Sequence, residues 1–290
     1  MDAYQRLKKK PSSFRQLTGL TMAEFEKLLG ELETAWKGQR AKRARSHPRQ
    51  RRPGGGRKAK LGLAARLVLV LIYYRTYVTQ DFLGFLFGID KGTACRIIQE
   101  IALLLTGIFR IPEKKVRIEP DEIAEAFVDG TEQPIYRPKK KQRRSYSGKK
   151  KRHTIKHQII VVRKKKQRGR KKQKRKVRIA AVSEAAAGKV HDKKIYDESK
   201  VQLPPEATGY GDTGYQGTNL KTPKKKPPKG QLSAPEKKRN RRLSRKRIVA
   251  EHGIGKMKIW RIAADRYRNP LRRHTVMMKN VAGLHNRMFS

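Results

Sequence analysis

The sequence contains one cysteine, Cys95, in 290 residues. A single thiol excludes disulfide bonds within the chain and zinc sites built from cysteines. Long apolar runs are missing too, because the longest, residues 67–74, is well short of the about 20 residues that span a bilayer. No apolar signal core follows the basic residues 1–14. These absences predict an intracellular protein with no membrane partner.

Acidic side chains are also scarce. The chain has 24 Asp and Glu against 74 Lys and Arg, which gives a formal net charge of +50. Each cation that meets a phosphate releases condensed counterions, so this excess predicts a polyanionic partner. Hydrophobic residues make up 36% of the chain and gather in blocks between basic runs. That pattern is typical of folded segments with basic insertions, not of a wholly disordered chain.

Three of the few carboxylates stand among apolar and glycine residues. We expect Asp129 and Asp212 at the ends of two apolar strands and Glu251 on an apolar helix stripe. Three carboxylates that converge from separate elements can bind paired divalent cations for phosphodiester chemistry. In so basic a chain, this arrangement predicts an enzyme that processes DNA.

Residues 1–112 predict an all-helical domain. Thr21 and Glu24 form a capping-box pattern, and apolar residues then recur at helical spacing up to Trp36. Residues 37–60 are cationic and rich in glycine, so we expect a linker that cannot bury enough surface to pack. It either meets a DNA groove or is simply a charged connection.

A helix-turn-helix is expected next, after a buried helix over residues 61–77. A helix over residues 79–87, a break at Gly88 and a helix over residues 91–105 fit this motif. The last helix buries a stripe of Ala94, Ile97, Ile98, Ile101 and Leu105. Its other side presents the candidate DNA contacts Lys91, Thr93, Arg96 and Gln99. A plain helical bundle is the alternative.

Residues 113–290 change from helical stripes to short apolar runs. Strands are expected over residues 124–129, 154–162, 177–182 and 207–212, and helices over 191–199, from Ser233 and over 276–288. The fold class is therefore α+β, with a helical domain followed by strand, strand, strand, helix, strand and helix. The cationic residues 163–176 are expected at a hairpin tip, either as a backbone contact or as a solvated loop.

The long helix from Ser233 carries the best-defined chemical pattern. Ser244, Arg247, Glu251 and Lys258 share one face at about 3.6 residues per turn. There a carboxylate can bind a metal ion while Arg247 clamps phosphate oxygens and Lys258 supplies a point charge. Ordinary charge pairs on a helix surface are the alternative for this helix taken alone.

Together, the three carboxylates predict a two-metal site. We expect Asp129 to bridge two ions about 3.5–4 Å apart, with Asp212 and Glu251 flanking them. A small set of hard oxygen ligands favours Mg²⁺ or Mn²⁺ over zinc.

Five sequence blocks resemble those of a known family. From about Leu17 onward, the chain is similar to bacterial insertion-sequence DDE transposases, in the group related to the eukaryotic Harbinger elements. The blocks, in order, are residues 129–135, 146–154, 191–194, 211–217 and 247–258. The family's helix often reads Tyr-x2-Arg-x3-Glu-x6-Lys, and Ser244 stands here in place of the tyrosine.

This resemblance implies a ribonuclease-H-like catalytic core over residues 113–290, with Asp129, Asp212 and Glu251 as the metal-binding triad. It also implies dependence on Mg²⁺, double-stranded DNA of element ends and target as partners, and strand joining through a 3′-hydroxyl. We further expect a homo-oligomer on DNA and a cytoplasmic, nucleoid-associated location.

Two other functions remain open. A catalytically silent or domesticated DNA-binding protein derived from a transposase would share the fold, but the intact triad favours an active enzyme. An RNA-binding or ribosomal protein would explain the charge and leave the carboxylates unexplained.

Overall fold

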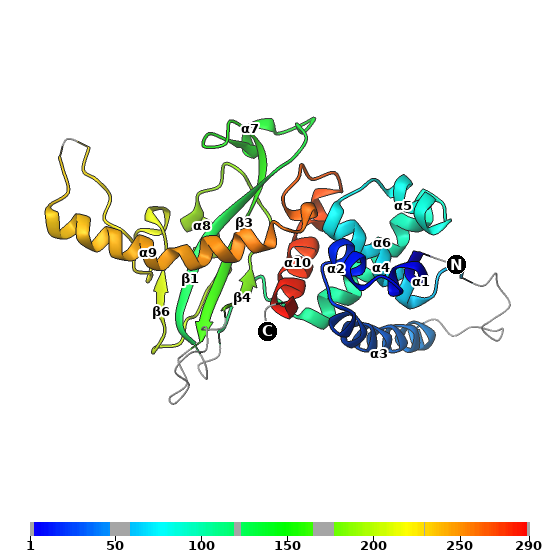
Figure 1. Ribbon diagram of the computed structural model, residues 1–290. Coiled ribbons are helices and arrows are strands. Elements are labelled where there is room, and N and C mark those ends of the chain that lie inside the picture. The colour runs from blue at the N-terminus through cyan, green and yellow to red at the C-terminus, as the bar shows by residue number, and fades with distance from the viewer. Residues whose placement is uncertain (1–2, 47–58, 119–122, 165–176, 229, 289–290) are drawn as a thin grey trace, which may run out of the picture. The chain divides into compact units, whose positions relative to one another are not determined.

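The computed structural model describes residues 3–46, 59–118, 123–164, 177–228 and 230–288 (Figure 1). The chain forms two compact units. The first comprises Met1–Arg110 with Trp260–Ile262, and the second comprises Ile111–Ile259 with Ala263–Ser290. The expected division after residue 112 stays a prediction as a domain boundary.

The first unit is helical. Its helices are α1 (Ala3–Lys8), α2 (Pro11–Thr18), α3 (Met22–Ser46), α4 (Leu63–Thr76), α5 (Gln80–Phe87) and α6 (Lys91–Phe109). The capping box that opens α3 is confirmed, because Thr21 N donates to Glu24 Oε2 at 2.7 Å and Glu24 N donates to Thr21 Oγ1 at 3.3 Å. These bonds satisfy N–H groups that a helix start otherwise leaves without partners.

The expected start of the linker at residue 37 is wrong. Helix α3 continues to Ser46, and residues 47–58 lie outside the described residues. The segment 37–46 is built largely from Ala, Arg, Lys and Gln, which favour helix even where no core covers them. We expected a linker because these residues are not buried, but their helix propensity is sufficient to continue the helix.

Helices α4, α5 and α6 form the expected helix-turn-helix arrangement. The break between α5 and α6 is made by Gly88 at φ 64°, a left-handed conformation that glycine adopts without strain. Asp90 then caps α6 by accepting from Thr93 N at 2.8 Å. The predicted inner stripe of α6 is buried throughout. By length and composition, α6 could also cross a membrane, but core helices of soluble domains pass the same test.

The second unit is built on a mixed sheet. Its strands are β1 (Ile123–Pro134), β2 (Tyr146–Ser147), β3 (Arg152–Lys164), β4 (Val177–Val182), β5 (Ala186–Ala187) and β6 (Thr208–Tyr210). β1 pairs antiparallel with β3 along its length and parallel with β6, while β4 pairs antiparallel with β3. The main order is thus β4-β3-β1-β6, with β1 inside the sheet.

Helices cover both faces of this sheet (Figure 1). They are α8 (Asp192–Ser199), α9 (Ala234–Met257) and α10 (His274–Met288), while the one-turn helix α7 (Gln142–Ser145) lies beyond the end of the sheet near the start of β3. Tyr196 of α8 packs with Ala126, Val128 and Ile160 on one face. On the other face, α9 approaches Val161 of β3. A mixed sheet between helices, after a helical unit, confirms the predicted α+β, ribonuclease-H-like architecture.

One strand boundary was predicted wrongly. β1 does not end at Asp129 but runs on to Pro134, so Asp129 lies in mid-strand opposite Ile159. Residues 130–134 are less apolar, yet each pairs with a residue of β3. Because pairing with a long partner strand satisfies the backbone, an apolar side-chain pattern is not required there. The short strands β2 and β5 were not predicted either.

Three buried histidines lie on the α9 side of the sheet and in α10. His157 Nδ1 donates to Ser183 O at 2.7 Å, and His157 Nε2 lies 2.7 Å from His274 Nδ1. Burial lowers the pKa of His157 to about 4 and that of His285 to about 4. Burial, followed by repulsion from His157, also lowers the pKa of His274. All three rings are therefore neutral in the folded protein at pH 7.

We predict that the free energy of unfolding falls as the pH is lowered from 7 to about 4. Unfolded histidines take up protons near pH 6.5, whereas folded His157 does not until about pH 4, so acid favours the unfolded chain. His157→Gln should make this dependence shallower by up to about 1.4 kcal/mol per pH unit in denaturant titrations. The exposed His252→Gln serves as the control. An unchanged slope in His157→Gln would contradict the prediction.

Candidate active site

Two of the predicted catalytic carboxylates lie at one level of the sheet. Phe127 of β1 pairs with Tyr210 of β6, and their rings stack at 5.3 Å. Asp129 and Asp212 each come two residues later. Because side chains two residues apart in an extended chain share a face, Asp129 lies on the face that α9 covers, and Asp212 lies beside it in the turn just beyond the end of β6. The predicted meeting of Asp129 and Asp212 thus follows from the register of two parallel strands.

The backbone holds each carboxylate from its own loop or strand. Asp129 Oδ1 accepts from Gly130 N at 2.9 Å, and Asp212 Oδ1 accepts from Gly214 N at 2.8 Å. The Asp212 bond caps the short 3₁₀ turn Thr213–Tyr215 that follows β6. Both side chains are half-buried.

Asp129 is the electrostatic centre of this group. Burial raises the pKa of its carboxyl, and the charges of Asp212 and Glu251 raise the pKa further. The guanidinium of Arg247 acts in the opposite direction, as does the N–H of Gly130. The four side chains from β1, the β6 turn and α9 therefore lie close enough to perturb one another. Anionic charge is concentrated here in a chain that is otherwise strongly cationic.

Helix α9 brings the remaining predicted residues. Arg247 is half-buried, whereas Ser244 and Glu251 are exposed. Lys258 caps the end of α9 and is exposed as a residue, but partial burial of its side chain, together with Lys150, lowers its pKa. The charge of Asp129 acts in the opposite direction, which places Lys258 within electrostatic range of this carboxylate.

Two buried polar atoms in this region have no hydrogen-bond partner among the described residues: Arg247 Nε and the hydroxyl of Tyr215. Tyr215 is fully buried, and burial raises the pKa of its phenol, as do Asp192, Asp129 and Asp212. A buried donor without an acceptor costs free energy, so both atoms are poised for an acceptor at this site.

The sequence did not reveal a second set of charges beneath the strand. Lys156 of β3 is buried, and its Nζ lies 3.1 Å from Asp192 Oδ1 and 3.4 Å from Glu132 Oε1. Asp192 in turn approaches the backbone of the site, because a Cβ on Gly130 would lie 3.1 Å from Asp192 Oδ1. Two signals pointed toward this set. Glu132 alternates with the core residues of β1, and His191-Asp192 lies in one of the family-like blocks, where it could support the site, contact DNA or simply begin a helix.

As the residues lie in this structure, the described part of the chain contains no group of three or more His, Cys, Asp or Glu side chains already arranged to hold a metal ion. The donor chemistry nevertheless suits one. Carboxylate oxygens are the hard ligands that Mg²⁺ prefers, and a divalent cation would relieve the repulsion around Asp129. Glu251 is exposed on a helix and has room to change its rotamer.

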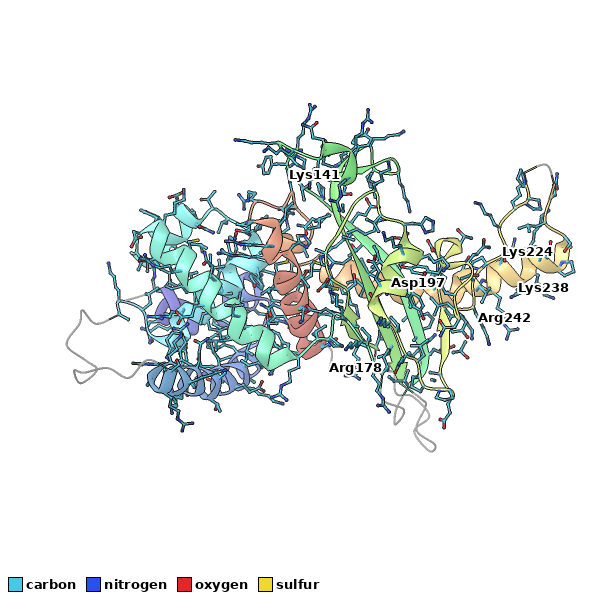
Figure 2. The ribbon with its side chains drawn as sticks, turned by 180° about the vertical axis from the view of Figure 1, so that it is seen from behind. Lys141, Arg178, Asp197, Lys224, Lys238 and Arg242 are labelled. Carbon is cyan, nitrogen blue, oxygen red and sulfur yellow. The ribbon has the colours of Figure 1, made fainter. Side chains whose placement is uncertain are left out.

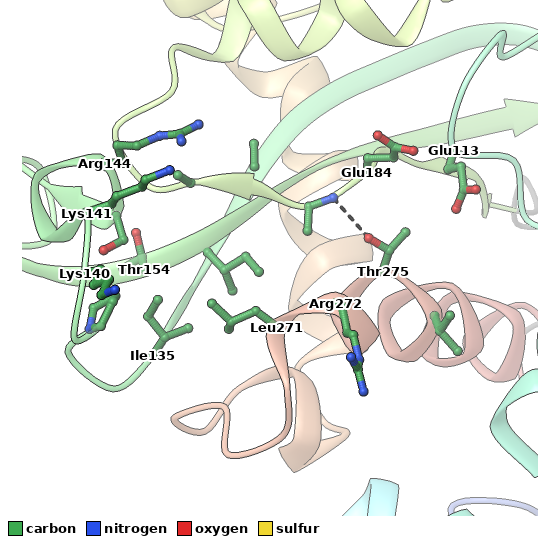
Figure 3. Close-up of a pocket in the computed structure, with 17 residues that line it drawn as sticks. Glu113, Ile135, Lys140, Lys141, Arg144, Thr154, Glu184, Leu271, Arg272 and Thr275 are labelled. Carbon is green, nitrogen blue, oxygen red and sulfur yellow. Dashed lines mark hydrogen bonds between the residues drawn. The ribbon is translucent and has the colours of Figure 1, made fainter. Parts of the chain in front are cut away.

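A separate cavity of about 640 Å³ lies elsewhere in the second unit (Figure 3). Ile135 and Leu271 line it together with Lys140, Lys141 and Arg144. None of the three predicted catalytic carboxylates lines it. This cavity is therefore not where the three predicted catalytic carboxylates lie.

The predicted DNA-contacting residues of α6 make contacts within the helical unit. Lys91 Nζ lies 3.1 Å from Asp81 Oδ2, and Arg96 donates to Thr93 Oγ1 at 2.9 Å. Gln99 donates to Cys95 Sγ at 2.9 Å. Lys91 and Arg96 are exposed, and Thr93 and Gln99 are half-buried, so the four residues lie apart from the buried stripe.

Comparison with known families shows to which family the chain belongs. Residues 128–286 match the family described as DDE superfamily endonuclease, a span that includes all three carboxylates. The chain belongs to the DDE superfamily endonucleases. Residues 59–106 match the helix-turn-helix of DDE superfamily endonucleases, which covers α4, α5 and most of α6.

Two relatives of this endonuclease are bacterial proteins whose names assign them to insertion sequence elements. A protein of Microchaete diplosiphon, named as a transposase for insertion sequence element IS702, is 32% identical over 239 residues, covering 80% of this chain and 82% of that protein. A protein of Streptomyces albus G, named as a transposase for insertion sequence element IS112, is 28% identical over 258 residues, covering 88% and 87%. No solved structure matches the chain.

These matches confirm the predicted family of bacterial insertion-sequence transposases and support a transposase with a DNA-binding helix-turn-helix. DDE superfamily endonucleases generally use divalent metal ions. The relation to Harbinger elements and the nucleoid location stay predictions.

We predict that Asp129→Asn raises the free energy of unfolding at neutral pH when no divalent ion is present. Because the folded pKa of Asp129 is raised by burial, its ionised form is disfavoured in the folded protein above that pKa. The gain should vanish as the pH falls below the unfolded value of about 3.9. Denaturant titrations at several pH values measure it. The exposed Asp197→Asn should change stability by no more than about 0.5 kcal/mol, and a loss in Asp129→Asn at pH 7 would refute the prediction.

Proposed function

We propose that this transposase cuts DNA at the ends of its own element and joins the freed 3′-hydroxyl to target DNA. Asp129, Asp212 and Glu251 are its catalytic residues and hold two divalent ions, Mg²⁺ or Mn²⁺. The observation that carries the proposal is the placement of Asp129 beside Asp212 and Glu251, where burial first and then the charges of these two carboxylates raise the pKa of Asp129. A group of anions that repel one another in a cationic chain is stabilised by a bound divalent cation.

Each residue has a distinct task in this proposal. Bound ions would activate the attacking oxygen and stabilise the leaving oxygen of the phosphodiester. Asp129 would offer its carboxylate to the ions from an inner strand, Asp212 would offer one from the turn after β6, and Glu251 would complete the set after a rotamer change on α9. Arg247 and Lys258 position the phosphates of the cut strand.

The Nε donor of Arg247 supports the proposed role of this residue in binding phosphate. Its Nε is buried and, within the described residues, without a hydrogen-bond partner. An arginine held in this way beside Asp129 can offer two parallel N–H groups to a phosphate. Lys258 has a flexible side chain, so its ammonium group can adjust its position as the charge on the phosphate changes during the reaction.

End recognition belongs to α6 in this proposal. Arg96 and Gln99 read base edges in the major groove, and Lys91 and Thr93 contact the backbone. Their bonds within the helix are exchanged for bonds to DNA. Two element ends held together for joining would require a homo-oligomer on DNA.

One observation favours the alternative of a catalytically silent DNA-binding protein. Ser244 occupies the position where related helices often have a tyrosine, and it is exposed. A hydroxyl there cannot stack on a base or sugar as a phenol can. The three carboxylates do not depend on this position, so we favour the active enzyme.

Single substitutions test the triad. Asp129→Ala, Asp212→Ala and Glu251→Ala should each abolish Mg²⁺- or Mn²⁺-dependent cleavage of element-end DNA, because each removes an oxygen ligand. Affinity for the same DNA in EDTA should stay almost unchanged. Nicking gels and fluorescence anisotropy measure the two properties. If one of the three variants cuts at the wild-type rate, that residue is not a metal ligand.

Substitutions in α6 of the full chain test whether this helix recognises the element ends. Arg96→Ala and Gln99→Ala should each reduce the preference for the inverted repeats bordering the coding sequence by about 1–3 kcal/mol, the value of a bidentate base contact. Competition between repeat and scrambled duplexes measures the preference. Lys194→Ala on α8 is the control, since this lysine is paired with Glu198. An unchanged preference in both α6 variants would assign α6 a structural role.

A further inference from the structure

Helix α9 exposes two different flanks. Leu243, Ala250, Ile254 and Met257 form its buried stripe. At about 3.6 residues per turn, the side with Arg247 and Glu251 lies on one flank of this stripe. Lys238, Arg242 and Arg245 fall on the opposite flank. One helix therefore separates an acidic, candidate catalytic flank from a purely cationic one.

The cationic flank borders a groove of about 1040 Å³. Among the described residues, seven cations line it against a single acid, Glu125. The cations are Arg163, Lys238, Arg239, Arg241, Arg242, Arg245 and Lys246. Lys238 and Arg242 lie with Lys224 toward the N-terminal half of α9, which extends past the sheet (Figure 2).

The one acid of the groove is already neutralised. Glu125 Oε2 lies 2.9 Å from Arg163 Nη2, and Glu125 Oε1 accepts from Lys246 Nζ at 2.9 Å. Arg163 Cζ also lies 5.1 Å from the ring centre of Phe127, and Lys246 Nζ lies 4.8 Å from that of Tyr210. Since the two rings stack, this network fixes the floor of the groove. The expectation that the hairpin tip begins at Arg163 is therefore wrong, because Arg163 belongs to β3, and residues 165–176 lie outside the described residues.

The other five cations of the groove are not balanced. Lys238, Arg239, Arg241, Arg242 and Arg245 make no ion pair with any carboxylate in the described ranges of the chain. Some surface cations elsewhere in the second unit are paired, as Lys193 is with Asp197 and Lys114 with Glu184. A concave surface with a fixed floor and several uncompensated guanidinium groups suits a phosphate backbone, which arginine binds through paired N–H groups.

We propose that this groove binds the phosphate backbone of a duplex DNA segment other than the strand at the carboxylates. From Lys238 to Arg245 the helix rises about 10 Å, which along the duplex axis corresponds to about three phosphates of one strand. A single strand cannot contact both flanks without passing around α9. The proposal rests on the DNA binding that the family indicates, and it is independent of the cutting reaction.

Matched charge variants of the full chain test the groove. The groove variant carries Arg241→Gln, Arg242→Gln and Arg245→Gln. The control carries Lys114→Gln, Lys193→Gln and Lys194→Gln, which removes the same charge from lysines that already face acids. Anisotropy of a duplex without element-end sequence is recorded over a salt series in EDTA, where no cleavage occurs. Thermal unfolding verifies that both variants fold.

The groove variant should lower the slope of log affinity against log salt by up to about 2.7, at about 0.9 for each lost phosphate contact. The control should change the slope by less than about 0.9. If the slope falls equally in both variants, the effect is one of net charge alone and the proposal is overturned. An unchanged slope in the groove variant would also overturn it, as would a lower slope with duplex RNA but not with duplex DNA. If the triple variant does not fold, Arg242→Ala alone should lower the slope by about 0.9, and no change would overturn the proposal. Because metal is absent, these results do not depend on whether the triad cuts.

Discussion

The close approach of α9 to the sheet determines the rest of the catalytic unit. A Cβ on Gly253 would lie 3.0 Å from Val161 Cγ2, which is tighter than most side-chain contacts, so glycine lets the helix backbone approach β3. This contact sets the height of α9 above β1, and with it the positions of Arg247 and Glu251 relative to Asp129. Interiors are packed too densely for a helix to shift without repacking its neighbours. A single packing contact therefore aligns side chains more than one hundred residues apart in the chain.

The distribution of charge gives this alignment its chemical meaning. In a chain of net charge +50, acids are few, and the described structure uses several of them in pairs with cations. Asp129 differs, since burial and neighbouring carboxylates disfavour its ionised form more than Arg247 favours it. Functional sites commonly keep such unfavourable charges at a cost in stability. Lys156, with Glu132 and Asp192, supports the strand from the other face without neutralising Asp129.

Local signals predicted most of the elements correctly. The capping boxes at Thr21 and Ser233 begin α3 and α9, because the bonds they form involve residues only three apart. The errors came from longer-range effects. β1 extends past Asp129 because β3 pairs with it, and α3 continues through residues 37–46 because of helix propensity without burial. The buried pairing of Lys156 with Asp192 could not be predicted, since it joins separate elements across the α8 face of the sheet.

The sequence alone determined the α+β class, the DNA partner and the three candidate carboxylates, because composition, periodicity and ordered motifs record local preference and charge. Only the tertiary structure decided that Asp129 and Asp212 stand at one level, that Arg247 lies within electrostatic range of Asp129, and that the opposite flank of α9 borders a cationic groove. These relations depend on strand register and on how a helix rotates about its axis when it packs. Neither quantity is encoded by any single segment; each follows from the simultaneous burial of many.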